Sequence, residues 1–171
     1  MNIKNDFQEI LDYAHYWNWT PDWLIVKEIY EKIPESYSVL TPFAYAYLEE
    51  LIRSTTSEYG RELLDEKGNQ KRRKVGLGLI QLAKDEHNKN LEYMQRLNEI
   101  KKYFENSTDL DSGDNRNSVD HGYMHPRFWT QESFENLIHD IAQISKYSRF
   151  QYERKMVEND WWTIYWYSNR N

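Results

Sequence analysis

Apolar residues recur at intervals of three and four positions over most of this chain, a spacing that is typical of amphipathic helices. The first stretch with this spacing lies close to the N-terminus and comprises Phe7, Ile10, Leu11, Ala14 and Trp17. It predicts a first helix with one buried face. No Asn-Gly or Asp-Gly pair lies between alternating apolar residues, so the pattern gives no indication of a β-hairpin.

Two Thr-Pro pairs predict where the next two helices begin. In Thr20-Pro21 the hydroxyl can cap a helix, and proline stands where its missing N–H costs nothing. We therefore expect a second helix from Thr20 to about Ile33. Thr41-Pro42 repeats the pattern and predicts a longer helix that reaches Leu64.

The second half of the chain continues the helical pattern. An apolar stripe over residues 75–104 predicts one long helix, and the polar residues 105–115 predict a mobile loop. Thr130 is expected to begin a last long helix that reaches Phe150. The aromatic residues of 161–166 suggest one more apolar segment, for packing or dimerisation. The pattern as a whole predicts an all-α, up-and-down bundle of about five helices, forming one domain over residues 1–171.

Composition limits the ways in which such a bundle could bind other molecules. The chain has 28 acidic and 22 basic residues, so it lacks the overall positive field of a protein that coats nucleic acid. Nucleic acid would have to bind a local patch, or a cleft made by two chains. Mean hydropathy is low, at -0.96, but aromatic residues make up 16% of the chain. This combination predicts an aromatic-rich core rather than disorder.

Several classes of site and location are not indicated by the sequence. There is no cysteine, so neither a disulfide framework nor a thiolate metal site is expected. Asp85-Glu86-His87 matches no recurring metal-ligand spacing, and His87 lies on the apolar stripe, which favours a core histidine. We expect no metal and no cofactor. No signal peptide and no membrane-spanning stretch is visible, so we expect a soluble, cytoplasmic protein.

The segment from Arg116 to Gly122 contains residue types suited to phosphate chemistry. Arginine offers a planar, permanently charged fork that fits phosphate oxygens, and histidine can transfer a proton near neutral pH. Asn115 and Gly122 are a helix cap and a helix stop, so we expect a short helix with Arg116 in its first turn. Five residues turn a helix by about 140°, so Arg116 and His121 diverge. Either the length of arginine spans that gap, or a second copy of the chain completes the site.

The pattern Arg116-Asn117-x-x-x-His121-Gly122 resembles the Arg-polar-x-x-x-His signature of the HEPN family. Members of that family are small helical bundles of toxin–antitoxin, abortive-infection and CRISPR-associated ribonucleases. The resemblance implies a metal-independent endoribonuclease that acts as a homodimer, with both motifs facing one cleft. Arg116 would hold the scissile phosphate, Asn117 would orient the pair and His121 would transfer a proton. It also makes an antitoxin or regulatory protein partner plausible.

Further residues could contact RNA. The only strong basic run, Lys71, Arg72, Arg73 and Lys74, could bind the phosphate backbone, or could be a solvated loop. Just past the motif, Tyr123, His125 and Arg127 could stack on a base, donate a proton and contact phosphate, or could simply pack the loop. Two alternatives to a nuclease remain: a non-catalytic HEPN-like RNA- or nucleotide-binding or regulatory scaffold, and a purely structural adaptor.

Overall fold

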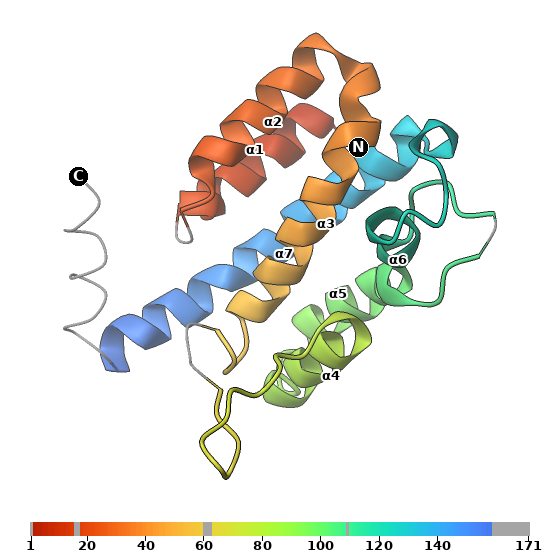
Figure 1. Ribbon diagram of the computed structural model, residues 1–171. Coiled ribbons are helices and arrows are strands. Elements are labelled where there is room, and N and C mark those ends of the chain that lie inside the picture. The colour runs from red at the N-terminus through yellow and green to blue at the C-terminus, as the bar shows by residue number, and fades with distance from the viewer. Residues whose placement is uncertain (1, 16–17, 60–62, 109, 159–171) are drawn as a thin grey trace.

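The computed structural model describes residues 2–15, 18–59, 63–108 and 110–158, with side chains described up to residue 148. These residues form an all-α bundle of seven α-helices, together with short 3-10 turns (Figure 1). The predicted fold class is therefore confirmed, while the predicted number of about five helices is wrong. None of the described helices is both long and apolar enough to cross a membrane. The aromatic segment 161–166 lies outside the described residues.

Helices α1 (Ile3–Ala14) and α2 (Thr20–Lys32) form an antiparallel pair at one side of the bundle (Figure 1). The apolar face of α1 is buried, as predicted from its spacing. Helix α2 begins at Thr20 as expected, but Trp19 and not Thr20 stands at the cap, and it makes no side-chain cap bond. Thr20 is therefore the first helical residue, and the predicted threonine cap is wrong.

Helix α3 (Tyr37–Ser54) crosses the centre of the molecule and differs from the prediction at both ends. It begins at Tyr37, directly after the 3-10 turn η2 (Pro34–Ser36), so Pro42 lies inside the helix and does not start it. It ends ten residues before Leu64. Three consecutive hydroxyl side chains at its end donate to helix carbonyls three residues earlier, which competes with continuation of the helix. They are Ser54, Thr55 and Thr56.

The predicted single helix over 75–104 is divided into α4 (Gly76–Glu86), α5 (Leu91–Ile100) and the 3-10 turn η3 (Lys101–Phe104). The break has two causes. His87 ends α4 and its ring Nε2 lies 2.6 Å from the Thr55 carbonyl oxygen, and Asn90 begins α5 by accepting a bond from the Tyr93 N–H. His87 is half-buried against the bundle, in line with the structural role expected of it.

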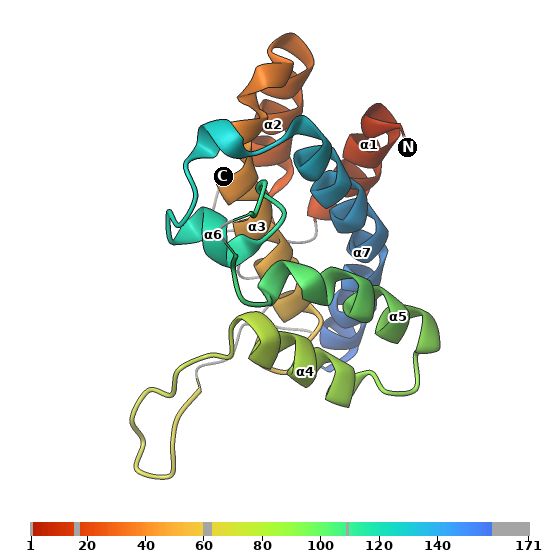
Figure 2. The same ribbon diagram turned by 90° about the vertical axis from the view of Figure 1, so that its right-hand side faces the viewer.

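The remaining helices are α6 (Arg116–Asp120) and α7 (Gln131–Glu158), with the 3-10 turn η4 (Pro126–Phe128) between them. Thr130, predicted as the first residue of this helix, stands one residue before it and accepts a bond from the Ser133 N–H. Helix α7 packs against α1 and α3, and α6 packs against α3 and η3 (Figures 1 and 2). The core between them is rich in aromatic residues, as expected, and Trp23, Tyr45 and Tyr47 are fully buried within it.

Candidate functional site

Helix α6 begins at a glycine turn that the bundle holds from both sides. Gly113 has a φ of +88°, and a Cβ added there would lie 2.7 Å from the Cβ of Trp129, so no larger residue fits. The buried Tyr45 hydroxyl of α3 donates to the Gly113 carbonyl at 3.0 Å. The turn is therefore fixed to the core and sets the direction in which α6 leaves it.

Two asparagine side chains fasten α6 to the end of η3. Asn115, the predicted cap, is buried, and its Oδ1 accepts bonds from the N–H groups of Asn117 at 2.8 Å and of Ser118 at 3.3 Å. Its Nδ2 donates to the Glu105 carbonyl, and the Asn117 Nδ2 donates to the same oxygen, each at 2.9 Å. The predicted short helix is confirmed, and its first turn is held in one place.

The guanidinium of Arg116 lies between two carboxylates. Its Nη2 is 3.2 Å from Oε2 of Glu49 on α3, and its Nε is 2.8 Å from Oδ2 of Asp120. The Arg116 side chain is 23% exposed and that of Glu49 is 9% exposed, so water screens the pair between them only in part. The phosphate-binding fork that the sequence predicted is thus already paired with carboxylates of the same chain.

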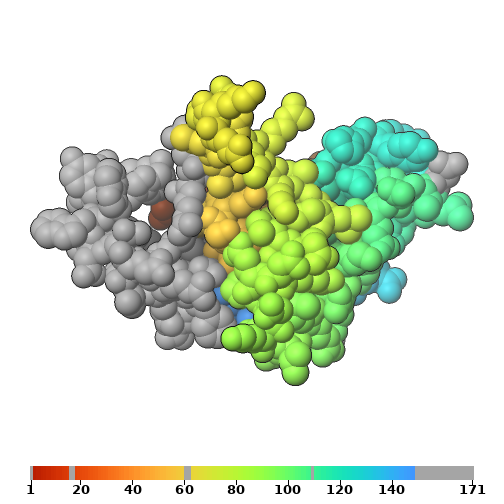
Figure 3. Space-filling model, turned by 90° about the horizontal axis from the view of Figure 1, so that it is seen from below, coloured from red at the N-terminus to blue at the C-terminus, as the bar shows by residue number. Residues whose placement is uncertain are grey.

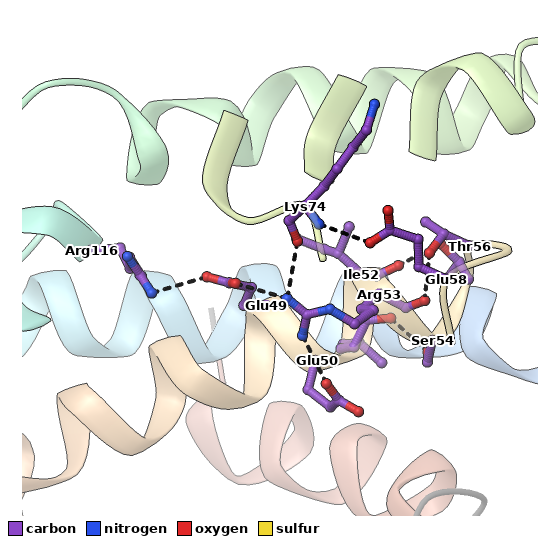
Figure 4. Close-up of polar contacts among 11 residues, drawn as sticks. Glu49, Glu50, Ile52, Arg53, Ser54, Thr56, Glu58, Lys74 and Arg116 are labelled. Atoms are coloured by element: carbon purple, nitrogen blue, oxygen red, sulfur yellow. Dashed lines mark hydrogen bonds and ion pairs between the residues drawn. The ribbon is translucent and has the colours of Figure 1, made fainter. Parts of the chain in front are cut away.

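Glu49 also links the site to the base of the basic loop (Figure 4). Its Oε1 accepts a bond from Arg53 Nη2 at 2.9 Å, and the same nitrogen is 3.3 Å from the Lys74 carbonyl. The backbone N–H of Lys74 in turn donates to Glu58. A continuous chain of ion pairs and hydrogen bonds therefore runs from α6 across α3 to the loop.

The sequence analysis did not identify Glu49 and Arg53 as part of this site. The available signal was position: Glu49 falls between the apolar residues Tyr45 and Ile52 on the buried face of α3, where an acid requires a partner. Nothing in the local sequence identifies that partner as Arg116.

Asp120 interacts with both proposed reactive side chains. Burial raises the pKa of its carboxyl above the usual value, and the negative charge of Glu49 adds to the shift, while Arg116 and His121 oppose it. Asp120 is therefore close enough to Arg116 and to His121 to interact electrostatically with both. Asp120 is thus the residue that holds the Nε of Arg116.

His121 stands at the other end of α6, where it is the C-terminal cap, and it is exposed. Gly122 follows with a φ of +63°, so the predicted helix stop is confirmed. Arg116 and His121 are thus carried at opposite ends of one short helix, in keeping with the divergence expected from helix geometry.

The other sequence candidates lie in two places. Tyr123, His125 and Arg127 follow α6 directly and are all exposed, and the Arg127 N–H donates to Nδ1 of His125 in a local turn. Lys71, Arg72, Arg73 and Lys74 are also exposed, in a loop that projects from the bundle well apart from α6 (Figures 2 and 3). The first group therefore follows α6 along the chain, and the second group lies apart from it.

A cavity of ≈ 310 Å³ opens beside the start of α6. Its lining includes Lys102, Glu105, Asp111 and Asp114, which make it polar and mainly acidic, and neither Arg116 nor His121 lines it. A negatively charged ligand would be repelled by this lining, so the cavity is separate from any phosphate site at Arg116. Comparison with models of protein families, with curated proteins and with solved structures finds no match to this chain.

Proposed function

We propose that this chain is a metal-independent endoribonuclease whose reactive groups are Arg116 and His121, as the HEPN resemblance implies. The observation that carries the proposal is the way in which α6 is held. Asn115 and Asn117 tie its first turn to the Glu105 carbonyl, so the helix that bears both groups has a fixed position. A site on a rigid element loses less entropy when it aligns a substrate.

The chemistry assigned to these groups needs no metal. The ribose 2′-oxygen attacks the adjacent phosphorus, the O2′–P bond forms and the P–O5′ bond breaks, which leaves a 2′,3′-cyclic phosphate and a free 5′-hydroxyl. His121 moves a proton in this step, from the 2′-hydroxyl or to the departing 5′-oxygen. The exposure of His121 supports this role, because RNA can reach its imidazole. Arg116 offsets the charge that develops on the phosphate.

The carboxylates around Arg116 give the proposed site a specific binding step. In the proposed mode of binding, a phosphate replaces Asp120 at Nε of the guanidinium, while Glu49 keeps its hold on Nη2 from the buried side. Asn117 acts as a positioning residue, since its amide is already engaged with Glu105. The proposed site is therefore pre-oriented but partly blocked until RNA displaces Asp120.

A homodimer remains part of this proposal. Because Arg116 and His121 leave α6 in different directions, two copies facing one cleft would place an arginine and a histidine on the same phosphate. The exposed basic run at residues 71–74 would contact RNA farther along its backbone and add affinity that depends on salt.

The test is cleavage of a structured RNA in the presence of EDTA, with identification of the product ends. Wild type should give 2′,3′-cyclic phosphate ends, and His121→Ala should cut roughly 100- to 10,000-fold more slowly. His15→Ala is the matched control, because it removes an exposed histidine at the end of α1, outside the proposed site, and should keep the activity within a few-fold. If His121→Ala cuts as fast as wild type while melting at the same temperature, the proposal is wrong.

One observation favours a second candidate, a non-catalytic RNA-binding or regulatory scaffold of the same fold. Arg116 is paired with two carboxylates, which is the arrangement expected of an arginine that joins α6 to α3. This candidate predicts RNA or partner binding that survives His121→Ala, with no cyclic phosphate product from any RNA.

A further inference from the structure

Another cavity, of ≈ 320 Å³, is lined by the loop that precedes α6 and by the segment that leads from α6 to α7 (Figure 2). Ligand pockets typically measure about 300–1,000 Å³, so this cavity suits one small group and not a folded partner. Its lining reaches close to the proposed reactive histidine, because Met124 follows His121 by three residues and their Cα atoms are at most about 11 Å apart. The lining residues are Leu110, Asp111, Ser112, Met124 and Phe128.

Most of this lining is apolar, and two of its side chains are open to solvent. Leu110 is 91% exposed and Phe128 is 59% exposed, while Met124 packs against the hydrophobic core. The backbone N–H of Phe128 donates to the His125 carbonyl at 3.0 Å, which holds the residue in the turn η4. An exposed aromatic ring on a fixed backbone is a surface on which another flat ring can stack.

Asp111 is the one charged residue in this lining, and its carboxylate is held in a fixed orientation. Its Oδ2 accepts a bond from the Thr108 N–H at 2.7 Å, and its Oδ1 accepts a bond from the Thr108 hydroxyl at 3.1 Å. Each oxygen of a carboxylate can accept a further hydrogen bond. The side chain of Asp111 therefore offers the cavity two adjacent acceptors and no donor.

Among the four RNA bases, only guanine matches two adjacent acceptors. Its Watson–Crick edge carries the N1–H and N2–H groups side by side, whereas adenine, cytosine and uracil each place an acceptor next to their donor. That acceptor would face a carboxylate oxygen and be repelled. The hydroxyl of Ser112, the other polar residue of the lining, can donate to O6 of guanine. The polar part of the lining is thus complementary to the edge of guanine, and the apolar part to its face.

From this match we infer that the cavity binds a guanine base of single-stranded RNA, with the ring on Phe128 and the Watson–Crick edge on Asp111. The inference rests on the proposed function, because it takes RNA as the ligand, and it adds a base preference to that function. A guanine bound within reach of His121 would direct cleavage to a phosphate close to that base.

Binding of modified RNA tests the inference on the wild-type protein. The probes are labelled oligouridines with guanosine, inosine, adenosine or cytidine at the central position, and with 2′-O-methyl groups throughout to prevent cleavage. Fluorescence anisotropy should show that the guanosine oligomer binds about 10- to 100-fold more tightly than the adenosine and cytidine oligomers. Inosine lacks only the N2 amino group, so its oligomer should bind with an affinity between those of guanosine and adenosine.

Asp111→Asn tests the acceptor pair. The amide of asparagine replaces one acceptor by a donor, so the ratio of the guanosine to the adenosine affinity should fall to within about threefold. The loss of a negative charge should at the same time raise both affinities. Asp114→Asn is the matched control, because Asp114 is an exposed acid of the same loop that does not line this cavity, and the ratio should stay unchanged.

Phe128→Ala tests the stacking surface. Loss of the ring should weaken binding of the guanosine oligomer about tenfold or more. Leu91→Ala is the control for the loss of an exposed apolar side chain, because Leu91 is 82% exposed on α5, and it should leave the affinity unchanged. If Phe128→Ala binds the guanosine oligomer as tightly as wild type, the inference is overturned.

The base comparison decides the matter even where a variant does not fold, since it changes the RNA and not the protein. Equal affinities of wild type for the guanosine, inosine and adenosine oligomers would overturn the inference and leave the cavity to another occupant, such as an apolar side chain of a protein. If cleavage still depended on His121, the proposed function would stand without it. A guanosine preference in a protein whose His121→Ala variant cuts as fast as wild type would contradict only the nuclease.

Discussion

Two clusters of basic side chains in this molecule are held in opposite ways. Arg116 and Arg53 share the buried carboxylate of Glu49 and have little contact with solvent (Figure 4). The four basic residues at positions 71–74 are exposed on a projecting loop. A cation in solvent adds affinity for any polyanion, whereas a cation held by carboxylates is aimed in one direction and binds a new anion only by exchange. Under the proposed function, the loop would attract RNA and Arg116 would position it.

The largest expected effect is a loss of stability when the carboxylate that holds Arg53 and Arg116 is removed. Glu49→Ala removes the acid shared by Arg53 and Arg116 and leaves both guanidinium groups partly unpaired. Breaking a buried pair costs about 3–5 kcal/mol, and because Arg116 keeps Asp120 and Arg53 keeps Glu50, we expect about 2–3 kcal/mol here. The midpoint of urea unfolding measures the loss.

Glu50→Ala is the matched control for that change. Glu50 pairs with the same Arg53 at the same distance of 2.9 Å, but its side chain is 31% exposed against 9% for Glu49. Solvent screening should hold its loss below about 1 kcal/mol. Equal losses in the free energy of unfolding for the two variants would contradict this prediction. They would mean that the ion pair between Glu49 and Arg116, which links α3 to α6, contributes little to stability.

The difference between local and distant contacts also explains which parts of the site could be predicted. The start and end of α6 were predicted correctly because a capping amide at Asn115 and a glycine at position 122 act on backbone within a few residues. The pairing of Arg116 with Glu49 could not be predicted, because Glu49 lies 67 positions away and only the packing of α6 on α3 brings the two together.

The helix boundaries follow the same rule. The start of α7 was predicted to within one residue, at Thr130, whose hydroxyl contacts a backbone N–H only three residues ahead. The break at His87 depends on the Thr55 carbonyl of a different segment, and no periodicity in 75–104 indicates it. The end of α3 was readable in principle from three consecutive hydroxyl residues, but its apolar spacing outweighed that signal in the prediction.

Asp120→Asn should let Arg116 bind an anion more readily, as the exposed basic residues of the loop do. The substitution removes the carboxylate that a phosphate must displace. A charge about 6 Å from that phosphate, at an effective dielectric constant of about 40, contributes about 1.4 kcal/mol, so RNA should bind about tenfold more tightly. Fluorescence anisotropy with a labelled single-stranded RNA measures this, and Asp85→Asn, on the exposed side of α4, serves as the control. Weaker or unchanged binding would contradict the displacement of Asp120 by phosphate.

A comparison of RNA binding by wild type and by Asp120→Asn at several pH values gives an independent check on Asp120. Burial raises its pKa above 3.8, so the Arg116–Asp120 ion pair is lost on acidification at a higher pH than for an ordinary aspartate. As the pH falls through that raised pKa, the RNA affinity of wild type should therefore approach the RNA affinity of Asp120→Asn. The stability contribution has the matching sign: the folded state holds this proton more tightly, so Asp120 destabilises least at low pH.

The smallest effects are expected in the loop, and they should be uniform across RNA sequences. Lys71→Gln and Arg72→Gln each remove one exposed charge, so each should weaken RNA binding by a few-fold and reduce the slope of log affinity against log salt by about 0.7. Lys89→Gln, an exposed lysine between α4 and α5, should change neither quantity. Because the loop lies apart from α6 and its charges act through solvent, these losses should add to the effect of Asp120→Asn without coupling. A loop variant that abolished the gain from Asp120→Asn would instead mean that the Lys74–Arg53–Glu49 chain transmits loop binding to Arg116.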